Sequence, residues 1–175
     1  MSAHTPRTPR DVKLWRNAIR EASTLESLRP DDGLIQQIML GPDKLVFTLT
    51  TGETFTVPSS ADRYMIASQA SEALGYRVDA NTATEWAPPR RTLNYWWAET
   101  LYNFGLLAPE GIMMNPDVVF VRVWREGPLA KIEAYDNASR AVATFDLRED
   151  HPPVDTVTDV LEELRTVRGK GTTGG

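Results

Sequence analysis

Few residues in this sequence have both the type and the spacing that catalysis or metal binding requires. Histidine occurs only as His4, near the N-terminus, and as His151, beside two prolines. A Ser-His-Asp triad or a His-rich metal site would have to use one of these two, so neither site is expected. The chain has no cysteine, which excludes disulfides, thiolate metal sites and a cysteine nucleophile and fits a reducing compartment. The glycine patterns that bind dinucleotides or nucleotide phosphates do not occur, and no cofactor is expected.

Carboxylates are the remaining source of site chemistry. Several of them together could form an acid–base pair or a Mg²⁺ site, but no spacing singles out a pair. A small carboxylate- or metal-dependent enzyme is therefore kept as a third hypothesis, which requires at least three carboxylates that converge in one cleft. The candidates are Asp31, Asp32, Glu53, Asp62, Asp79, Glu85 and Glu99.

The segment 91–106 is rich in aromatic residues and is predicted to be a helix. Leu93, Trp97, Leu101 and Phe104 have the spacing of an ordinary core stripe. Three further aromatic residues are expected to point away from that stripe: Tyr95, Trp96 and Tyr102. Two interpretations remain open. Neighbours cover this helix on more than one side, or one of its faces binds a partner or a second copy, because aromatic side chains anchor interfaces.

A later group of strands shows a second asymmetry. One predicted face is small and apolar, with Val119, Val121 and Val123 beside Ala130, Ile132 and Ala134. The other face carries aromatic and charged side chains: Phe120, Arg122, Trp124, Lys131, Glu133 and Tyr135. Aromatic and basic groups that alternate on an open sheet are typical of platforms for single-stranded nucleic acids. The alternative is that a helix covers this face and its long side chains reach the edges.

These segments belong to a larger pattern of helices and strands. Helical spacing is present at 11–28, 59–75, 91–106 and around 157–167, with Asp11 and Ser59 as predicted N-caps. Alternating or turn-bounded segments predict six strands, at 34–40, 45–50, 54–57, 118–125, 129–135 and 141–147, and a short one is considered at 76–78. The predicted class is α+β, with antiparallel β meanders in two groups of about three strands packed with about four helices. The pattern leaves open whether the strands form one sheet or two.

The domain organisation follows from this pattern and from the composition. A chain of 175 residues with 41% hydrophobic and 25% charged residues fits one globular domain. We expect a disordered basic arm at 1–10, a single α+β domain at 11–167 and a disordered tail at 168–175. The domain has two halves of similar layout, at 11–80 and 90–167.

The charge is mildly acidic, with a net value of −5, which argues against strong non-specific binding to duplex DNA. No signal peptide or membrane-spanning run is recognised, so a soluble cytoplasmic protein without a membrane partner is expected. The excess of arginine over lysine suggests a GC-rich, bacterial genome.

Three functions are therefore carried forward. The first is a non-catalytic protein–protein interaction module of the adaptor, chaperone or inhibitor (immunity) type, which binds a protein partner or a second copy. The second is a nucleic-acid-binding accessory protein, in which Arg122 and Lys131 would converge with Arg90 and Arg91. The third is the carboxylate enzyme. The expected partner-binding residues are Tyr95, Trp96, Tyr102, Phe120, Arg122, Trp124, Lys131 and Tyr135.

Overall fold

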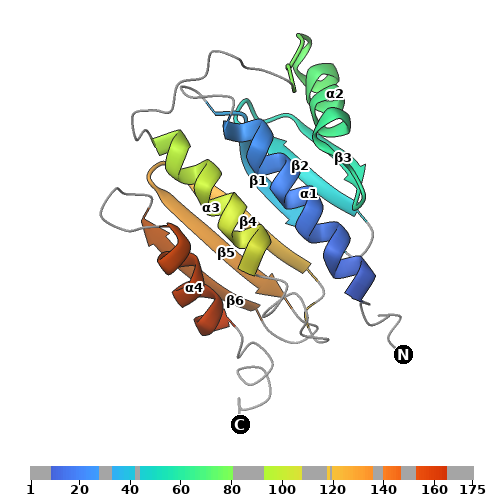
Figure 1. Ribbon diagram of the computed structural model, residues 1–175. Coiled ribbons are helices and arrows are strands. Elements are labelled where there is room, and N and C mark those ends of the chain that lie inside the picture. The colour runs from blue at the N-terminus through green and yellow to red at the C-terminus, as the bar shows by residue number, and fades with distance from the viewer. Residues whose placement is uncertain are drawn as a thin grey trace.

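A computed structural model of the chain describes residues 9–27, 33–41, 44–80, 93–107, 118, 120–135, 140–146 and 153–164. The described residues form four helices and six strands (Figure 1). In chain order they are α1 (Pro9–Ser27), β1 (Ile35–Leu40), β2 (Lys44–Leu49), β3 (Thr54–Pro58), α2 (Arg63–Leu74), α3 (Leu93–Leu107), β4 (Phe120–Glu126), β5 (Leu129–Tyr135), β6 (Arg140–Asp146) and α4 (Pro153–Leu164). The predicted arm and tail lie outside these residues, except that Pro9 and Arg10 belong to α1.

The six strands form one sheet, with the order β3-β2-β1-β4-β5-β6, and every neighbouring pair is antiparallel. The predicted α+β class with an antiparallel sheet and four helices is confirmed. β1 and β4 pair at the centre, where Ile38 lies opposite Val123 and Gln37 lies opposite Trp124. This pairing joins the first three strands to the last three and answers the question of one sheet or two.

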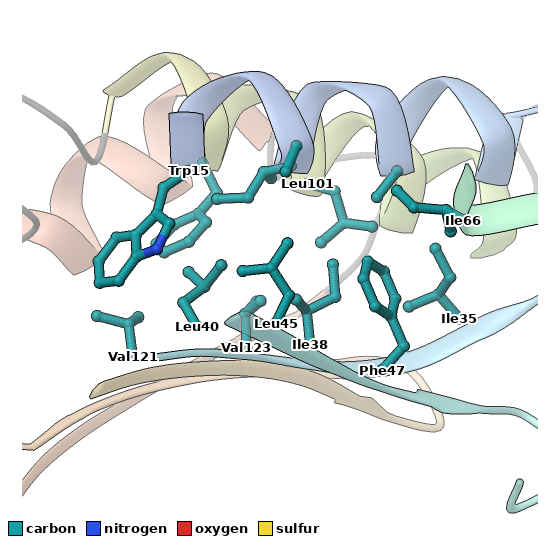
Figure 2. Close-up of a cluster of buried hydrophobic side chains, with 14 of the residues drawn as sticks. Trp15, Ile35, Ile38, Leu40, Leu45, Phe47, Ile66, Leu101, Val121 and Val123 are labelled. Atoms are coloured by element: carbon teal, nitrogen blue, oxygen red, sulfur yellow. The ribbon is translucent and has the colours of Figure 1, made fainter. Parts of the chain in front are cut away.

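All four helices contribute to a core on one side of this sheet. α1, α3 and α4 lie side by side across it, with α3 in the middle, and α2 lies near β3 (Figure 1). Trp15 of α1 points toward the sheet, while Leu40 and Val121 point back toward the helices (Figure 2). Burying one large apolar side chain stabilises the folded state by roughly 1.5–3 kcal/mol relative to leaving it exposed to water. The core includes Trp15, Ile38, Leu40, Phe47, Ile66, Trp97, Leu101, Val121, Val123 and Leu164, all buried.

Buried polar contacts fix how α1 and α3 sit on the sheet. The Trp97 indole N–H donates to the Ile35 carbonyl at 2.8 Å, and the Ser23 hydroxyl donates to the Ala98 carbonyl at 3.1 Å. Gly105 allows the two helices to approach closely, because a Cβ atom there would lie 3.0 Å from Cγ of Arg20. The helix layer is therefore held in register by hydrogen bonds as well as by apolar packing.

Glu26 lies near the end of α1, and a glutamate is ordinarily expected to face solvent. It is instead fully buried. Its carboxylate accepts the backbone N–H of Ile35 at 2.8 Å and that of Leu34 at 3.1 Å. Charge-assisted hydrogen bonds of this kind compensate for burying the carboxylate and fix the start of β1 against the end of α1.

The ends of α1 and α2 differ from the predicted ends. α1 begins at Pro9, so Asp11 is within the helix and is not its N-cap. The N-cap of α2 is Asp62, not Ser59, and its side chain accepts the N–H of Met65 at 2.9 Å. Gly75 ends α2 with φ 81°, as predicted. The short strand considered at 76–78 does not form; the Val78 N–H donates to the Ser71 hydroxyl instead.

Candidate functional site

The face of the sheet opposite the helices, here called the open face, carries most of the residues expected to bind a partner. Phe120, Arg122 and Trp124 of β4 project there, because the intervening Val121 and Val123 are buried in the core. In the register, Phe120 lies opposite Tyr135, Arg122 opposite Glu133 and Trp124 opposite Lys131. The predicted division of β4 and β5 into an apolar and a mixed face is confirmed for the described residues.

Arg122 lies at the centre of the open face and has three contacts there. Its Nε atom donates to the Gln37 side-chain oxygen at 2.7 Å, and a terminal nitrogen lies 3.2 Å from a carboxylate oxygen of Glu133. The guanidinium carbon lies 3.7 Å from the centroid of the Trp124 ring, which is within the range of a cation–π contact. The guanidinium therefore links β1, β4 and β5.

Trp124 is covered by these neighbours and is only 7% exposed. Its indole N–H donates to Glu126 at 2.8 Å. Lys131 donates to the other oxygen of Glu126 at 2.8 Å, and its ammonium lies 5.8 Å from the Trp124 ring centroid. The hydrogen bonds from Lys131 and Trp124 hold the pKa of the Glu126 carboxyl below its ordinary value. Two cations of the same chain, Arg122 and Lys131, therefore already contact the Trp124 ring.

Tyr135 closes the other side of this cluster. Its hydroxyl donates a hydrogen bond to the Glu133 carboxylate, which also accepts one from the Arg122 guanidinium. Glu133 is only 3% exposed. Burial raises the pKa of the Tyr135 phenol above its ordinary value, and the hydrogen bond to Glu133 raises it further. The ring packs edge-on against Phe120, with centroids 6.3 Å apart and planes at 75°. The polar groups of the open face are consequently held in fixed positions.

Apolar side chains surround this polar cluster. Phe120 is 40% exposed and Val142 of β6 is 46% exposed. Val142 lies opposite Glu133 in the pairing of β6 with β5, and Met39 lies opposite Arg122 in the pairing of β1 with β4. Leu129 lies opposite Glu126 and is half-buried. The open face therefore combines accessible apolar groups at its edges with a charged, hydrogen-bonded centre.

Two of the three residues expected on α3, Trp96 and Tyr102, do not join this surface. Trp96 is 5% exposed and belongs to the core, because α3 lies between α1 and α4 and has neighbours on both flanks. Tyr102 is 38% exposed, but it lies in the helix layer on the opposite side of the sheet, where the guanidinium carbon of Arg20 is 5.3 Å from its ring centroid. The side chain of Tyr95 lies outside the described residues.

Comparison with known proteins returned no match. No family model, no curated protein and no solved structure is similar to this chain at a significant level.

Sequence reasoning missed three contributors to the open face: Gln37, Met39 and Val142. The alternation of β1 marks the first two as facing away from the core, but their neighbours depend on the pairing of β1 with β4. That pairing joins strands more than 80 residues apart and leaves no local signal. Val142 follows from the alternation of β6 once its pairing with β5 is known.

The carboxylates kept for an enzyme do not come together among the described residues. No group of three or more histidine, aspartate or glutamate side chains in this part of the chain could hold a metal ion. Asp62 caps α2, and Glu53 accepts the Thr51 hydroxyl at 2.6 Å. Asp31, Asp32 and Glu85 lie outside the described residues. No helix in the described ranges has the length and apolar character needed to cross a bilayer.

Proposed function

We propose that this protein is a non-catalytic protein-interaction module, of the adaptor, chaperone or inhibitor type, and that it binds its partner through the open face. The observation that supports this most strongly is the exposure of Phe120 and Val142, at 40% and 46%, beside the ordered cluster around Arg122. Exposed apolar groups next to fixed polar groups suit a protein interface, where an anchor residue enters a pocket and polar atoms set the orientation. The rigidity of the cluster reduces the entropy lost on binding.

The same arrangement supports a protein partner more than a nucleic acid. A stacking platform needs an accessible aromatic face and cations that are available to phosphates. Trp124 is covered by Arg122, and both Arg122 and Lys131 are already paired with carboxylates. Arg90 and Arg91, which the nucleic-acid hypothesis also requires, lie outside the described residues.

A site-specific photo-crosslinker tests this proposal. The photoreactive phenylalanine analogue benzoyl-phenylalanine is placed at position 120 in cells that naturally produce the protein. A matched variant carries it at Tyr76, which is 59% exposed but lies after α2. Discrete protein adducts at position 120 that are missing at position 76 are the expected result, and mass spectrometry then identifies the partner.

Two results would contradict the proposal. One is adduct patterns that are the same at both positions, which would indicate random collisions. The other is adducts at position 120 that nuclease digestion removes, which would favour the nucleic-acid alternative. Circular dichroism of both purified variants checks that the fold is retained.

A further inference from the structure

The helix layer has a charge distribution that the open face does not use. On α1, Lys13, Arg16 and Arg20 follow one another at intervals of three and four residues and therefore lie along one side of the helix. Lys13 is exposed, and Arg16 and Arg20 are half-buried. These three residues are called the basic stripe.

Two carboxylates of α1, Glu21 and Glu26, are engaged away from this stripe. Glu21 accepts the backbone N–H of Arg63 at 3.0 Å, at the start of α2, and Glu26 is buried against Leu34 and Ile35. In the described part of the chain no member of the basic stripe forms an ion pair. The Nε atoms of Arg16 and Arg20 are buried and have no acceptor there. One exposed and two half-buried basic side chains thus lie along α1 in a protein whose net charge is −5.

The opposite flank of the helix layer is acidic. α4 buries Val157, Val160, Leu161 and Leu164. Its described exposed positions include Asp159 and Glu162, which lie three residues apart and therefore on one side of the helix. These two residues are called the acidic stripe. α1 and α4 lie on either side of α3 on the same face of the sheet (Figure 1).

The geometry points to a two-fold homodimer that forms through the helix layer. A two-fold axis that runs along α3 brings the basic stripe of each copy against the acidic stripe of the other, and Tyr102 of both copies then lies near the axis. A two-fold interface uses the same surface twice, so a single chain that carries both stripes forms two complementary contacts. At physiological salt the Debye length is about 8 Å, so the repulsion between the net charges of the two copies is largely screened beyond that distance, while pairs in close contact are screened less.

The charge pattern selects a second copy over other occupants. An acidic segment of another protein would pair with the basic stripe alone and would make no use of the acidic stripe. A two-fold axis that lies in the interface and runs perpendicular to α3 would place the basic stripe of one copy against the basic stripe of the other. Repulsion between these like charges would weaken such a dimer. Among these arrangements, only the homodimer with its axis along α3 places each stripe opposite a stripe of the other sign.

Light scattering coupled to size exclusion, together with sedimentation, tests the dimer. The wild-type chain is expected at twice its 19.6 kDa mass. One variant carries Lys13→Glu and Arg16→Glu, and a second carries Asp159→Lys and Glu162→Lys. Each alone is expected to raise the dimer dissociation constant about ten-fold or more, because like charges then face each other. An equimolar mixture of the two variants is expected to restore a dimer, which also shows that both variants fold.

Phe120→Ser on the open face is the matched control and is expected to leave the dimer unchanged. A monomeric wild-type chain would overturn the inference, as would variants that dimerise like the wild type. A mixture that stays monomeric would also overturn it, because it would show that the stripes do not pair with each other. A dimer that only Phe120→Ser disrupts would place self-association on the open face, which rejects this inference while leaving the proposed interaction surface intact.

Discussion

The guanidinium of Arg122 lies over the ring of Trp124, with its central carbon 3.7 Å from the ring centroid. The two residues are on the same strand two positions apart, so both project from the open face. The contact covers the largest aromatic ring of that face and places a cation beside the buried carboxylate of Glu133. Arg122 therefore determines how much of the Trp124 ring is accessible on this face.

Replacing Arg122 with methionine should lower the free energy of unfolding by about 2 kcal/mol, because it removes a charged donor from the buried Glu133. Arg122→Lys is the matched control. This variant keeps the positive charge, so its free energy of unfolding should fall by less than half of the decrease expected for Arg122→Met. Urea unfolding followed by circular dichroism measures both values. Equal losses in the two variants would show that the charge near Glu133 is not the cause.

Tyr135 should make stability depend on pH in the alkaline range. Its pKa is raised in the folded protein, since burial and the bond to Glu133 both favour the neutral phenol. The protonated phenol therefore contributes stability below its unfolded pKa of about 10, and this contribution is lost as the pH rises through the folded pKa. The free energy of unfolding should fall more steeply above pH 10 in the wild type than in Tyr135→Phe. Parallel curves for the two proteins would contradict this.

The N-cap of α2 offers a comparison between two neighbouring residues. Asp62 accepts the Met65 N–H at 2.9 Å, whereas Ser59 precedes the helix by four residues. Asp62→Ala should therefore cost about 1 kcal/mol of unfolding free energy. Ser59→Ala, at the position that the sequence pattern favours, should change it by less than about 0.5 kcal/mol. Thermal and urea denaturation measure both, and the reverse order would restore Ser59 as the cap.

The open face could be predicted from the sequence only within one hairpin. Alternation along β4 and β5, together with the short turn at Gly127, fixes which side chains face away from the core and which ones lie opposite each other, as for Phe120 and Tyr135. The position of Gln37 beside Arg122 could not be predicted in this way. It depends on β1 pairing with β4, and the pairing of distant strands has no local sequence signal.

The helix predictions show a similar limit. Periodicity correctly places Trp97, Leu101 and Phe104 in the core. Periodicity does not show how many neighbouring elements cover the rest of α3. Trp96 is buried because α1 and α4 flank that helix, and the spacing of residues within α3 carries no information about these two neighbours. Glu26 resembles a solvated residue for the same reason, because its partners belong to a segment that follows α1 and returns to it.

Glu26 should therefore be among the most sensitive polar positions of the chain. Its carboxylate is fully buried and accepts the N–H groups of Leu34 and Ile35. Glu26→Ala should lower the free energy of unfolding by about 3 kcal/mol, since it leaves buried donors without this acceptor. The exposed Glu72→Ala should change it by less than about 0.5 kcal/mol. Hydrogen exchange adds a local measurement: the amides of Leu34 and Ile35 should lose more protection than the amides of β5. A uniform loss of protection across the sheet would show that Glu26 stabilises the whole fold and not specifically the start of β1.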